Sequence, residues 1–407
     1  METLQEKCIN VLSRNFHKKP IACANSQLKP ELLQKIHEGL CPDLDPFGLA
    51  RHVVSERYWQ RCLEQQQQHV FALSTTAKSS VLQSALQQVL EDDDEERMEC
   101  IDLDTIVEHI FALRLTKISL NVDLSKTFTS LKNLTSLEIE LGPSGMSVDE
   151  ARILGKALTS VEYLTSLSMT NCCLSDDSIR AMKDGMNSSS TGSPPLRLPR
   201  GLISLDVSDN KLTAGGLGLL FDMLLPLDED GNNIRPSVLS SFVAANNCID
   251  EEGGRFLATD VLPVCTSLTH LNVKLNEMGD VGGEMVLNAL RDHNNGSSCG
   301  GSHLQEINLA GNGLASKTAE SLTELLRSTG NNIASLSFID LSLNNLSSED
   351  IARVLSAVEG NSGGRRGATL LHLDLQENSG LDKEAGRSNQ SDVFRIMERD
   401  CGVRVFL

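Results

Sequence analysis

The sequence predicts an α/β solenoid, in which parallel strands form the inner layer and helices form the outer layer. Three observations predict this fold class. A pattern of apolar residues that ends around an asparagine, L-x-x-L-x-L-x-x-N-x-L, recurs along most of the chain. Consecutive copies lie roughly 30–40 residues apart, which leaves room for one helix in each repeat. Apolar residues make up 40% of the sequence and aromatic residues only 3%, so we expect an aliphatic core.

The clearest copy of the pattern lies between residues 333 and 345, where the sequence reads IASLSFIDLSLNN. Residues two apart in a strand face the same side, so Ile339 and Leu341 should both face the core. This pattern is that of leucine-rich repeats. The predicted fold is therefore a right-handed leucine-rich-repeat solenoid of the ribonuclease-inhibitor type, with further strands centred on Leu137, Leu167, Leu205, Phe242, Leu271, Ile307 and Leu373.

One asparagine follows the strand in each repeat and turns the chain outward. Its side-chain amide can bond the backbone groups that the turn would otherwise leave unpaired. A single repeat cannot bury its apolar face, so stability must come from stacking neighbouring repeats. The predicted structural asparagines are Asn171, Asn210, Asn247, Asn276, Asn312, Asn344 and Asn378.

A helix is predicted after each of these strands, and several of these helices begin with Ser or Asp in a capping position. The expected helices cover residues 148–161, 175–187, 213–225, 250–262, 279–293, 316–328 and 347–359. Glycines in the first turns, such as Gly253-Gly254 and Gly282-Gly283, predict close approach between helices. Segments rich in Gly, Ser or Pro are predicted to form loops along one edge, at residues 188–200, 226–237, 294–302 and 361–367.

Residues 1–112 do not carry the repeat and predict a helical domain that caps the solenoid, which then spans residues 113–407. Helices are expected near the N-terminus and at residues 30–39, 49–68, 81–90 and 101–113. The acidic run at 91–96, EDDDEE, predicts a solvated loop, with a docking site for a basic partner as the alternative.

The two ends of the repeat array are predicted to be irregular. The first strand is expected around Ile118 and Leu120, too close to the strand at Leu137 to leave room for a helix. At the other end, an amphipathic helix is expected at residues 393–397. The alternation in residues 403–407 predicts a closing strand beside the strand at Leu373.

Charge and composition exclude several classes of function. The formal net charge is −19, which argues against binding to nucleic acid or to an anionic membrane. No signal-peptide pattern opens the sequence, and no apolar run has transmembrane length. The eleven cysteines include no C-x-x-C spacing. These features predict a reduced intracellular compartment.

The sequence contains no recognisable catalytic, phosphate-binding or metal-binding motif, so we expect no enzymatic activity, no cofactor and no metal site. The side chains that point away from the core of each strand should form a concave face for protein recognition. The predicted partner-binding residues on this face are Glu138, Glu140, Asp206, Asn272, Lys274, Asn308, Asp340, Asp374 and Gln376.

Several stretches resemble one known family. The runs at residues 268–290 (LTHLNVKLNEMGDVGGEMVLNAL) and 307–326, together with VDEARILGKAL at 148–158, are similar to its repeats. Outside the repeats, the element Tyr58-Trp59-Gln60-Arg61-Cys62 resembles its N-terminal Y-W-[KR]-R-C sequence. The family is that of the T-complex-associated testis-expressed leucine-rich-repeat proteins, which form subunit five of the nexin–dynein regulatory complex of cilia. The segment at 188–200 and the C-terminal tail have no counterpart in it.

The resemblance implies a non-enzymatic scaffold in the cytoplasm and cytoskeleton, on the axoneme of a cilium or flagellum. It would bind other subunits of the complex, help to link doublets and restrain dynein. Because tubulin is also acidic, we expect little direct binding to tubulin. Two alternatives remain open from the sequence: a Ran-type GTPase-activating leucine-rich-repeat protein, and an adaptor or inhibitor-like repeat module.

Overall fold

The computed structural model describes residues 4–16, 29–66, 76–188, 198–199, 201–224, 237–292, 303–327, 336–361, 370–380 and 403–407. Internal contacts divide the chain into two compact units. Unit 1 comprises Met1–Glu140 and Lys156–Leu164, and unit 2 comprises Leu141–Gly155 and Thr165–Leu407. The expected boundary between a helical and a repeat domain at residue 112 stays a prediction.

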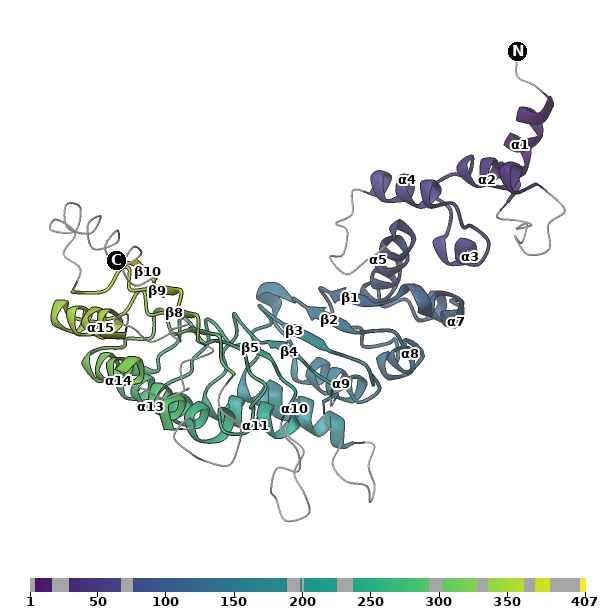
Figure 1. Cartoon of the computed structure of the whole chain (residues 1–407). Coiled ribbons are helices and arrows are strands. Elements are labelled where there is room, and N and C mark those ends of the chain that lie inside the picture. Colours follow the sequence, from purple (N-terminus) through teal and green to yellow (C-terminus); the bar gives the residue numbers. More distant parts are fainter. Residues whose placement is uncertain are drawn as a thin grey trace. The chain divides into compact units, whose positions relative to one another are not determined.

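Unit 1 contains the N-terminal helices and the first pair of strands (Figure 1). The strands β1 (Ala112–Leu115) and β2 (Ser136–Ile139) pair in parallel. The helices are α1 (Leu4–Asn15), α2 (Pro30–Glu38), α3 (Pro46–Ala50), α4 (Glu56–Gln66), α5 (Ala77–Glu91), α6 (Glu95–Glu99), α7 (Leu103–Ile106), the 3₁₀ turn η2 (Val107–His109) and α8 (Leu124–Ser130).

Three predictions for unit 1 were wrong. The helix expected at 49–68 is two helices, α3 and α4, separated at residues 51–55. The first strand is β1, not the segment around Ile118 and Leu120, and the helix expected at 101–113 therefore stops early. Ile118 is buried and Leu120 is 57% exposed, so this pair does not face one core. With the strand moved earlier, α8 fits before β2.

The acidic run 91–96 explains this error. Its side chains are exposed or half-buried, as a solvated segment should be, but two of its carboxylates also accept hydrogen bonds from residues 116–122. The Glu91 carboxylate accepts a hydrogen bond from the Thr116 backbone N–H at 2.6 Å, and Asp93 accepts one from the Asn121 N–H at 3.0 Å. Asp94 caps α6 by accepting from the Arg97 N–H. The carboxylates thus hold residues 116–122 in a turn rather than in a strand.

Unit 2 repeats a strand and a helix along its length. It begins with the 3₁₀ turn η3 (Gly142–Ser144) and most of α9 (Val148–Leu158), whose last three residues belong to unit 1. The strands that follow are β3 (Ser166–Met169), β4 (Ser204–Asp206), β5 (Ser241–Val243), β6 (His270–Asn272), β7 (Glu306–Asn308), β8 (Phe338–Asp340), β9 (His372–Asp374) and β10 (Arg404–Phe406). The helices are α10 (Asp176–Asn187), α11 (Ala214–Leu224), α12 (Glu251–Phe256), the π-helical turn η4 (Leu257–Val261), α13 (Gly279–Asp292), α14 (Ser316–Arg327) and α15 (Ser348–Asn361).

Each strand from β3 to β9 pairs in parallel with the next strand along the chain, and the helices α10 to α15 lie along one side of the strand row (Figure 1). In register, the central residues Leu205, Phe242, Leu271, Ile307, Ile339 and Leu373 are all buried. The predicted solenoid, its strand centres and its helices are confirmed. The closing strand is also confirmed, because β10 pairs with β9. The predicted loops and the helix at 393–397 lie largely or wholly outside the described residues.

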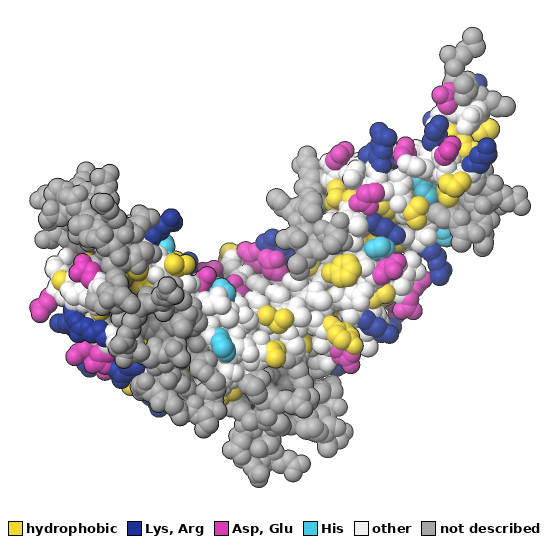
Figure 2. Space-filling model, viewed as in Figure 1, with side chains coloured by type: hydrophobic (Ala, Val, Ile, Leu, Met, Phe, Trp, Pro, Cys, Tyr) yellow, Lys and Arg dark blue, Asp and Glu magenta, His cyan; other side chains and the backbone are white. Residues whose placement is uncertain are grey.

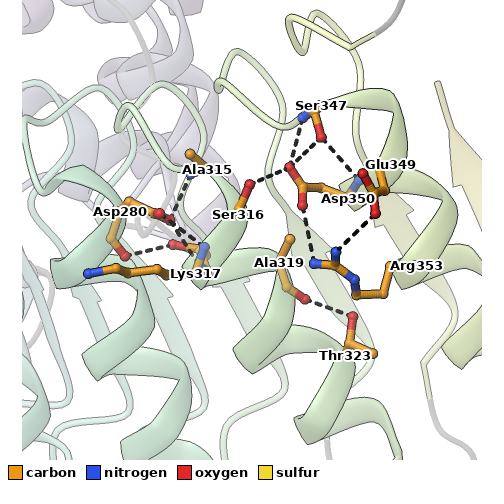
Figure 3. A network of polar contacts seen from close by, with 11 residues as sticks. Asp280, Ala315, Ser316, Lys317, Ala319, Thr323, Ser347, Glu349, Asp350 and Arg353 are labelled. Carbon is orange, nitrogen blue, oxygen red and sulfur yellow. Dashed lines mark hydrogen bonds and ion pairs between the residues drawn. The ribbon is translucent and has the colours of Figure 1, made fainter.

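Aspartates near the helix N-termini tie neighbouring repeats together (Figure 3). Asp280 of α13 accepts hydrogen bonds from the backbone N–H groups of Ala315, Lys317 and Thr318, at 2.9–3.0 Å, where α14 begins. Asp350 of α15 accepts from Ser347 and from the Ser316 hydroxyl. Burial would raise the pKa of Asp280, but these hydrogen bonds outweigh it and lower the pKa below 3.8.

Candidate functional site

The candidate site is the face of strands β3 to β10 that points away from the helices, which we call the open face of unit 2. Side chains alternate along each strand, so the residues on either side of a buried central residue point to the open face. Ser204 and Asp206 flank buried Leu205 in this way, and both are half-buried. Because the strands pair in parallel and in register, these positions form two rows across unit 2.

The side chains of the first row are small on β3 to β5 and large on β6 to β10. The strand register aligns Ser166, Ser204, Ser241, His270, Glu306, Phe338, His372 and Arg404. The second row aligns Ser168, Asp206, Val243, Asn272, Asn308, Asp340, Asp374 and Phe406. Most of the charged, amide and aromatic side chains, which can bind a partner, therefore lie on β6 to β10.

The structure brings five of the predicted partner-binding residues into the second row: Asp206, Asn272, Asn308, Asp340 and Asp374. Lys274 and Gln376 lie just beyond β6 and β9 and are exposed.

Glu138 and Glu140 belong to unit 1 instead. Glu138 forms an ion pair with Arg114 of β1 at 3.4 Å, and Glu140 also contacts Arg114. Sequence reasoning missed Arg114 because it placed the first strand too late. Whether any of the nine predicted residues contacts a partner stays a prediction.

Sequence reasoning also missed an aromatic group in these rows. Phe338 and His372 stack with ring centroids 4.6 Å apart, and His372 and Phe406 stack at 4.4 Å. Beside them, His270 lies 3.4 Å from Glu306. The available signal was positional, because Phe338 occupies the same place in its repeat as His270 and His372. Three stacked rings across β8 to β10 give this end of the open face an apolar surface.

The second row is electrostatically negative near β8 and β9. Asp340 accepts hydrogen bonds from the Asn308 amide at 2.8 Å and from the Ser342 N–H at 3.0 Å. Burial, followed by the neighbouring charge of Asp340, raises the pKa of Asp374. Two carboxylates in register on adjacent strands repel each other, so this place favours the approach of a cationic group.

Buried asparagines hold the strands of the open face in place from behind. The Asn344 carbonyl oxygen accepts from the N–H groups of Asn312 and Leu314 in the preceding repeat, and its amide donates to Leu309, Leu341 and Ser342 carbonyls. Equivalent bonds between repeats are made by Asn210, Asn247, Asn276 and Asn378, and the Asn312 amide donates to the Val273 carbonyl of the preceding repeat.

Asn171 does not occupy this position, although the sequence interpretation assigned it there. It is exposed and has a left-handed backbone, with φ of 51°. Buried Cys172 stands at the equivalent place, and its N–H donates to Asn210. The repeat aligns only when the frame from Leu167 through Met169 to Leu174 is kept, which puts Cys172 where the other repeats have asparagine.

The N-terminal element Tyr58, Trp59, Arg61 and Cys62 faces the core of unit 1. Trp59 Nε1 donates to the Val53 carbonyl at 3.1 Å, and an Arg61 guanidinium nitrogen donates to the Leu40 carbonyl at 2.7 Å. Tyr58, Trp59 and Cys62 are almost fully buried, and burial is the first cause that raises the pKa of Tyr58. In this structure the element packs unit 1.

The viewed surface mixes acidic, basic and hydrophobic side chains (Figure 2). Within the described ranges, no helix has the length and apolar character that crossing a membrane requires. Among the same residues, no cluster of three or more His, Cys, Asp or Glu side chains is suited to a metal ion. The open face therefore offers hydrogen bonds, carboxylates and ring surfaces, which are the contacts used in protein recognition.

Comparison with known proteins supports the repeat assignment. A family model described as "Leucine Rich repeat" matches residues 264–287. Over 59 residues the chain is 44% identical to human "Dynein regulatory complex subunit 5"; the match covers 14% of this chain and 11% of that protein. The chain therefore matches only a small part of the length of this relative.

Two solved structures are similar at low identity. An internalin (inlF) from Listeria monocytogenes is 17% identical, with a TM-score of 0.31 over 62% of each chain. A chain of the yeast Rad7 and Elc1 complex is 12% identical, with a TM-score of 0.39 over 96% of this chain and 99% of that one. The fold is an α/β leucine-rich-repeat solenoid, as the matched repeat and the parallel pairing of successive strands show.

Proposed function

We propose that the protein is a non-enzymatic scaffold subunit of a nexin–dynein regulatory complex, and that the open face of unit 2 contacts its protein partners. The observation that carries the proposal is the 44% identity over 59 residues to a human subunit of the dynein regulatory complex. Leucine-rich-repeat solenoids use extended strand faces for binding, and the rows on β6 to β10 supply suitable polar and aromatic groups.

The same proposal specifies where the protein acts. It would lie in the cytoskeleton of a cilium or flagellum, on the axoneme, and would contribute to doublet linkage and to the control of motility. With a net charge of −19, the protein should be held there by other subunits rather than by the acidic tubulin lattice. The partner-binding residues would be those of the second row, with Lys274 and Gln376 at its margin.

Tagging the full chain in a ciliated cell tests the proposal. We expect axonemal localisation and co-purification with subunits of the dynein regulatory complex. A variant with Asp340→Asn, Asp374→Asn and Asn308→Ala should localise less and recover fewer of these subunits, whereas a variant at exposed helix positions, Asp177→Asn and Glu252→Gln, should behave like the wild type. A cytosolic protein that recovers none of these subunits would contradict the assignment.

Co-sedimentation with microtubules tests the expected lack of direct binding to tubulin. Purified full-length protein should stay in the supernatant when microtubules are sedimented at low ionic strength, where surface electrostatics are strongest. Saturable, salt-sensitive co-sedimentation would show that the isolated chain binds the lattice, and the role assigned to the other subunits would then be wrong.

A further inference from the structure

A row of left-handed residues runs along unit 2 just after the strands. Residues at this place in their repeats have a positive φ between 51° and 64°, and they are Asn171, Asp209, Asn246, Leu275, Gly311, Leu343 and Glu377. In the repeats before the last, the N–H of this residue donates to a carbonyl of the following repeat, from Asp209 to Ala245, Leu275 to Ala310 and Leu343 to Gln376, at 2.7–2.9 Å. The left-handed conformation thus belongs to the hydrogen-bond ladder between repeats.

Leucine is an unfavourable residue for this position. The left-handed conformation suits Gly, Asn and Asp, whereas a bulky side chain there is an outlier. Asn246 and Gly311 follow that preference, but Leu275 and Leu343 do not. Compared with a leucine in a right-handed or extended backbone conformation, each of these leucines shifts the folding equilibrium toward the unfolded state by roughly tenfold.

Burial within this chain does not offset much of that strain. Leu275 is 45% exposed and Leu343 is 49% exposed. Between them stands Gly311, and the Leu275 side chain packs against it, since a Cβ on Gly311 would lie 2.7 Å from Leu275 Cδ2. Two leucines therefore flank a glycine across three repeats, about 10 Å apart at the usual strand spacing. We call this surface the leucine notch.

Acidic side chains lie near the Leu343 side of the notch, whereas exposed Lys274 precedes Leu275. Asp340 lies three residues before Leu343, and its carboxylate accepts from the N–H and the hydroxyl of Ser342. Asp374, on the adjacent strand, pairs in register with Asp340. Exposed Glu377 occupies the next position of the left-handed row. Charge complementarity therefore favours a partner that carries cationic side chains beside its apolar ones.

We infer that the leucine notch, formed by Leu275, Gly311 and Leu343, docks a basic amphipathic segment of a partner protein. Apolar side chains of that segment cover the two leucines, and its lysines or arginines lie against Asp340, Asp374 and Glu377. This inference rests on the proposed function, because it names the class of partner that the open face of unit 2 takes.

The test uses the full-length protein and a library of random 15-residue peptides displayed on phage. We expect the selected peptides to combine Leu, Ile or Phe with Lys or Arg. Binding of the best synthetic peptide should weaken at least about tenfold in the Leu275→Asn, Leu343→Asn double variant, where burial of its apolar residues is lost. Raising the salt concentration should weaken binding to the wild type.

Ile203→Asn is the matched control. Ile203 is 48% exposed, so its replacement loses a similar burial, but its backbone is not left-handed. We expect Ile203→Asn to keep full peptide binding. It should also lower the urea midpoint more than Leu275→Asn or Leu343→Asn does, because asparagine relieves strain only in the left-handed row.

Each outcome decides the inference. Selection of acidic peptides, selection of none, or equal binding by the double variant would overturn it. The double variant is also tagged in the ciliated cell: if it recovers the complex as fully as the wild type, the notch inference fails while the scaffold function stands. If the wild type recovers no subunit, the scaffold function itself fails.

Discussion

At the scale of single residues, the buried asparagine of each repeat combines two tasks. Asn344 is 4% exposed, yet both polar atoms of its side chain have partners, because the amide reaches backbone groups in its own and in the preceding repeat. Leaving buried N–H groups unpaired costs about 1–3 kcal/mol each. The side chain thus turns the chain out of the strand and fixes the stacking of two repeats.

Asn344→Ala should therefore lower the free energy of unfolding by roughly 2–4 kcal/mol. The neighbouring Asn345 is exposed, and Asn345→Ala should change it by less than about 0.5 kcal/mol. Urea denaturation of both full-length variants measures the difference. Equal effects of the two substitutions would show that the asparagine hydrogen bonds do not hold the repeats together.

The residue scale also shows where a pattern in the sequence misleads. The sequence pattern favours Asn171 for the structural position. Asn171 lies one residue before that position, however, and the buried position belongs to Cys172. Cys172 is held there by apolar burial, and its Sγ lies 3.2 Å from the Thr170 carbonyl. A thiol cannot reproduce the five bonds of an amide, so this repeat depends on Asn210 of the next one.

At the scale of elements, glycines set the distance between neighbouring helices. A Cβ on Gly254 of α12 would lie 2.7 Å from the Cα of Gly282 in α13, closer than real Cβ atoms approach backbone. The first-turn glycines predicted such an approach from the sequence. The conformational cost of glycine in a helix is thus offset by tight contact between the two helices.

Two glycine-to-alanine substitutions separate these effects. Gly254→Ala should destabilise the fold by about 1–3 kcal/mol, because the added methyl group overpacks against backbone. Gly218 of α11 has no atom within 4 Å of its would-be Cβ, so Gly218→Ala should stabilise by about 0.5–1 kcal/mol through helix propensity alone. Thermal unfolding of both variants shows whether each substitution raises or lowers the stability. A stabilising effect of Gly254→Ala would refute the close-packing argument.

At the scale of the whole molecule, the two units should respond to different ranges of pH. Burial lowers the pKa values of His37, His52 and His109, all in unit 1, below 6.5. His37 is fully buried, and neither of its ring nitrogens has a hydrogen-bond partner among the residues that the structure describes. In unit 2, by contrast, Asp280 and Asp350 have pKa values below 3.8.

The signs of these shifts predict acid unfolding in two stages. Below pH 6.5 these histidines are protonated in the unfolded state but stay neutral in the folded state. Unit 1 therefore loses stability as the pH falls toward the pKa values that the histidines have in the folded protein. The aspartates of unit 2 contribute stability above about pH 4 and lose it only as the pH falls below that value. Unit 1 should therefore unfold first.

Trp59, the only tryptophan in the chain, lies in the core of unit 1 and reports on that unit by fluorescence. Circular dichroism reports mainly on the larger unit 2. We expect the fluorescence transition at the higher pH, and His37→Leu should move it toward lower pH. His303→Leu, at an exposed position in unit 2, is the control. The prediction would be contradicted if the fluorescence and circular dichroism transitions coincided and if His37→Leu did not shift them.

The sequence by itself determined the repeat, its strand centres and its helices. These follow from local periodicity, because leucines at fixed spacing can be buried only if each repeat stacks on the next. It also determined the closing strand through the alternation of residues 403–407. Where periodicity was interrupted, at β1 and at the acidic run, the sequence was a poor guide.

Only the tertiary structure decided what lies next to what. The stacking of Phe338, His372 and Phe406, the pairing of Asp340 with Asp374, and the left-handed row all join residues from different repeats. A linear pattern states which side chains face outward, but the register between strands and the hydrogen-bond ladder fix their neighbours and backbone angles. That is why the polar residues of the second row could be predicted from the sequence, whereas the aromatic stack and the leucine notch became visible only in three dimensions.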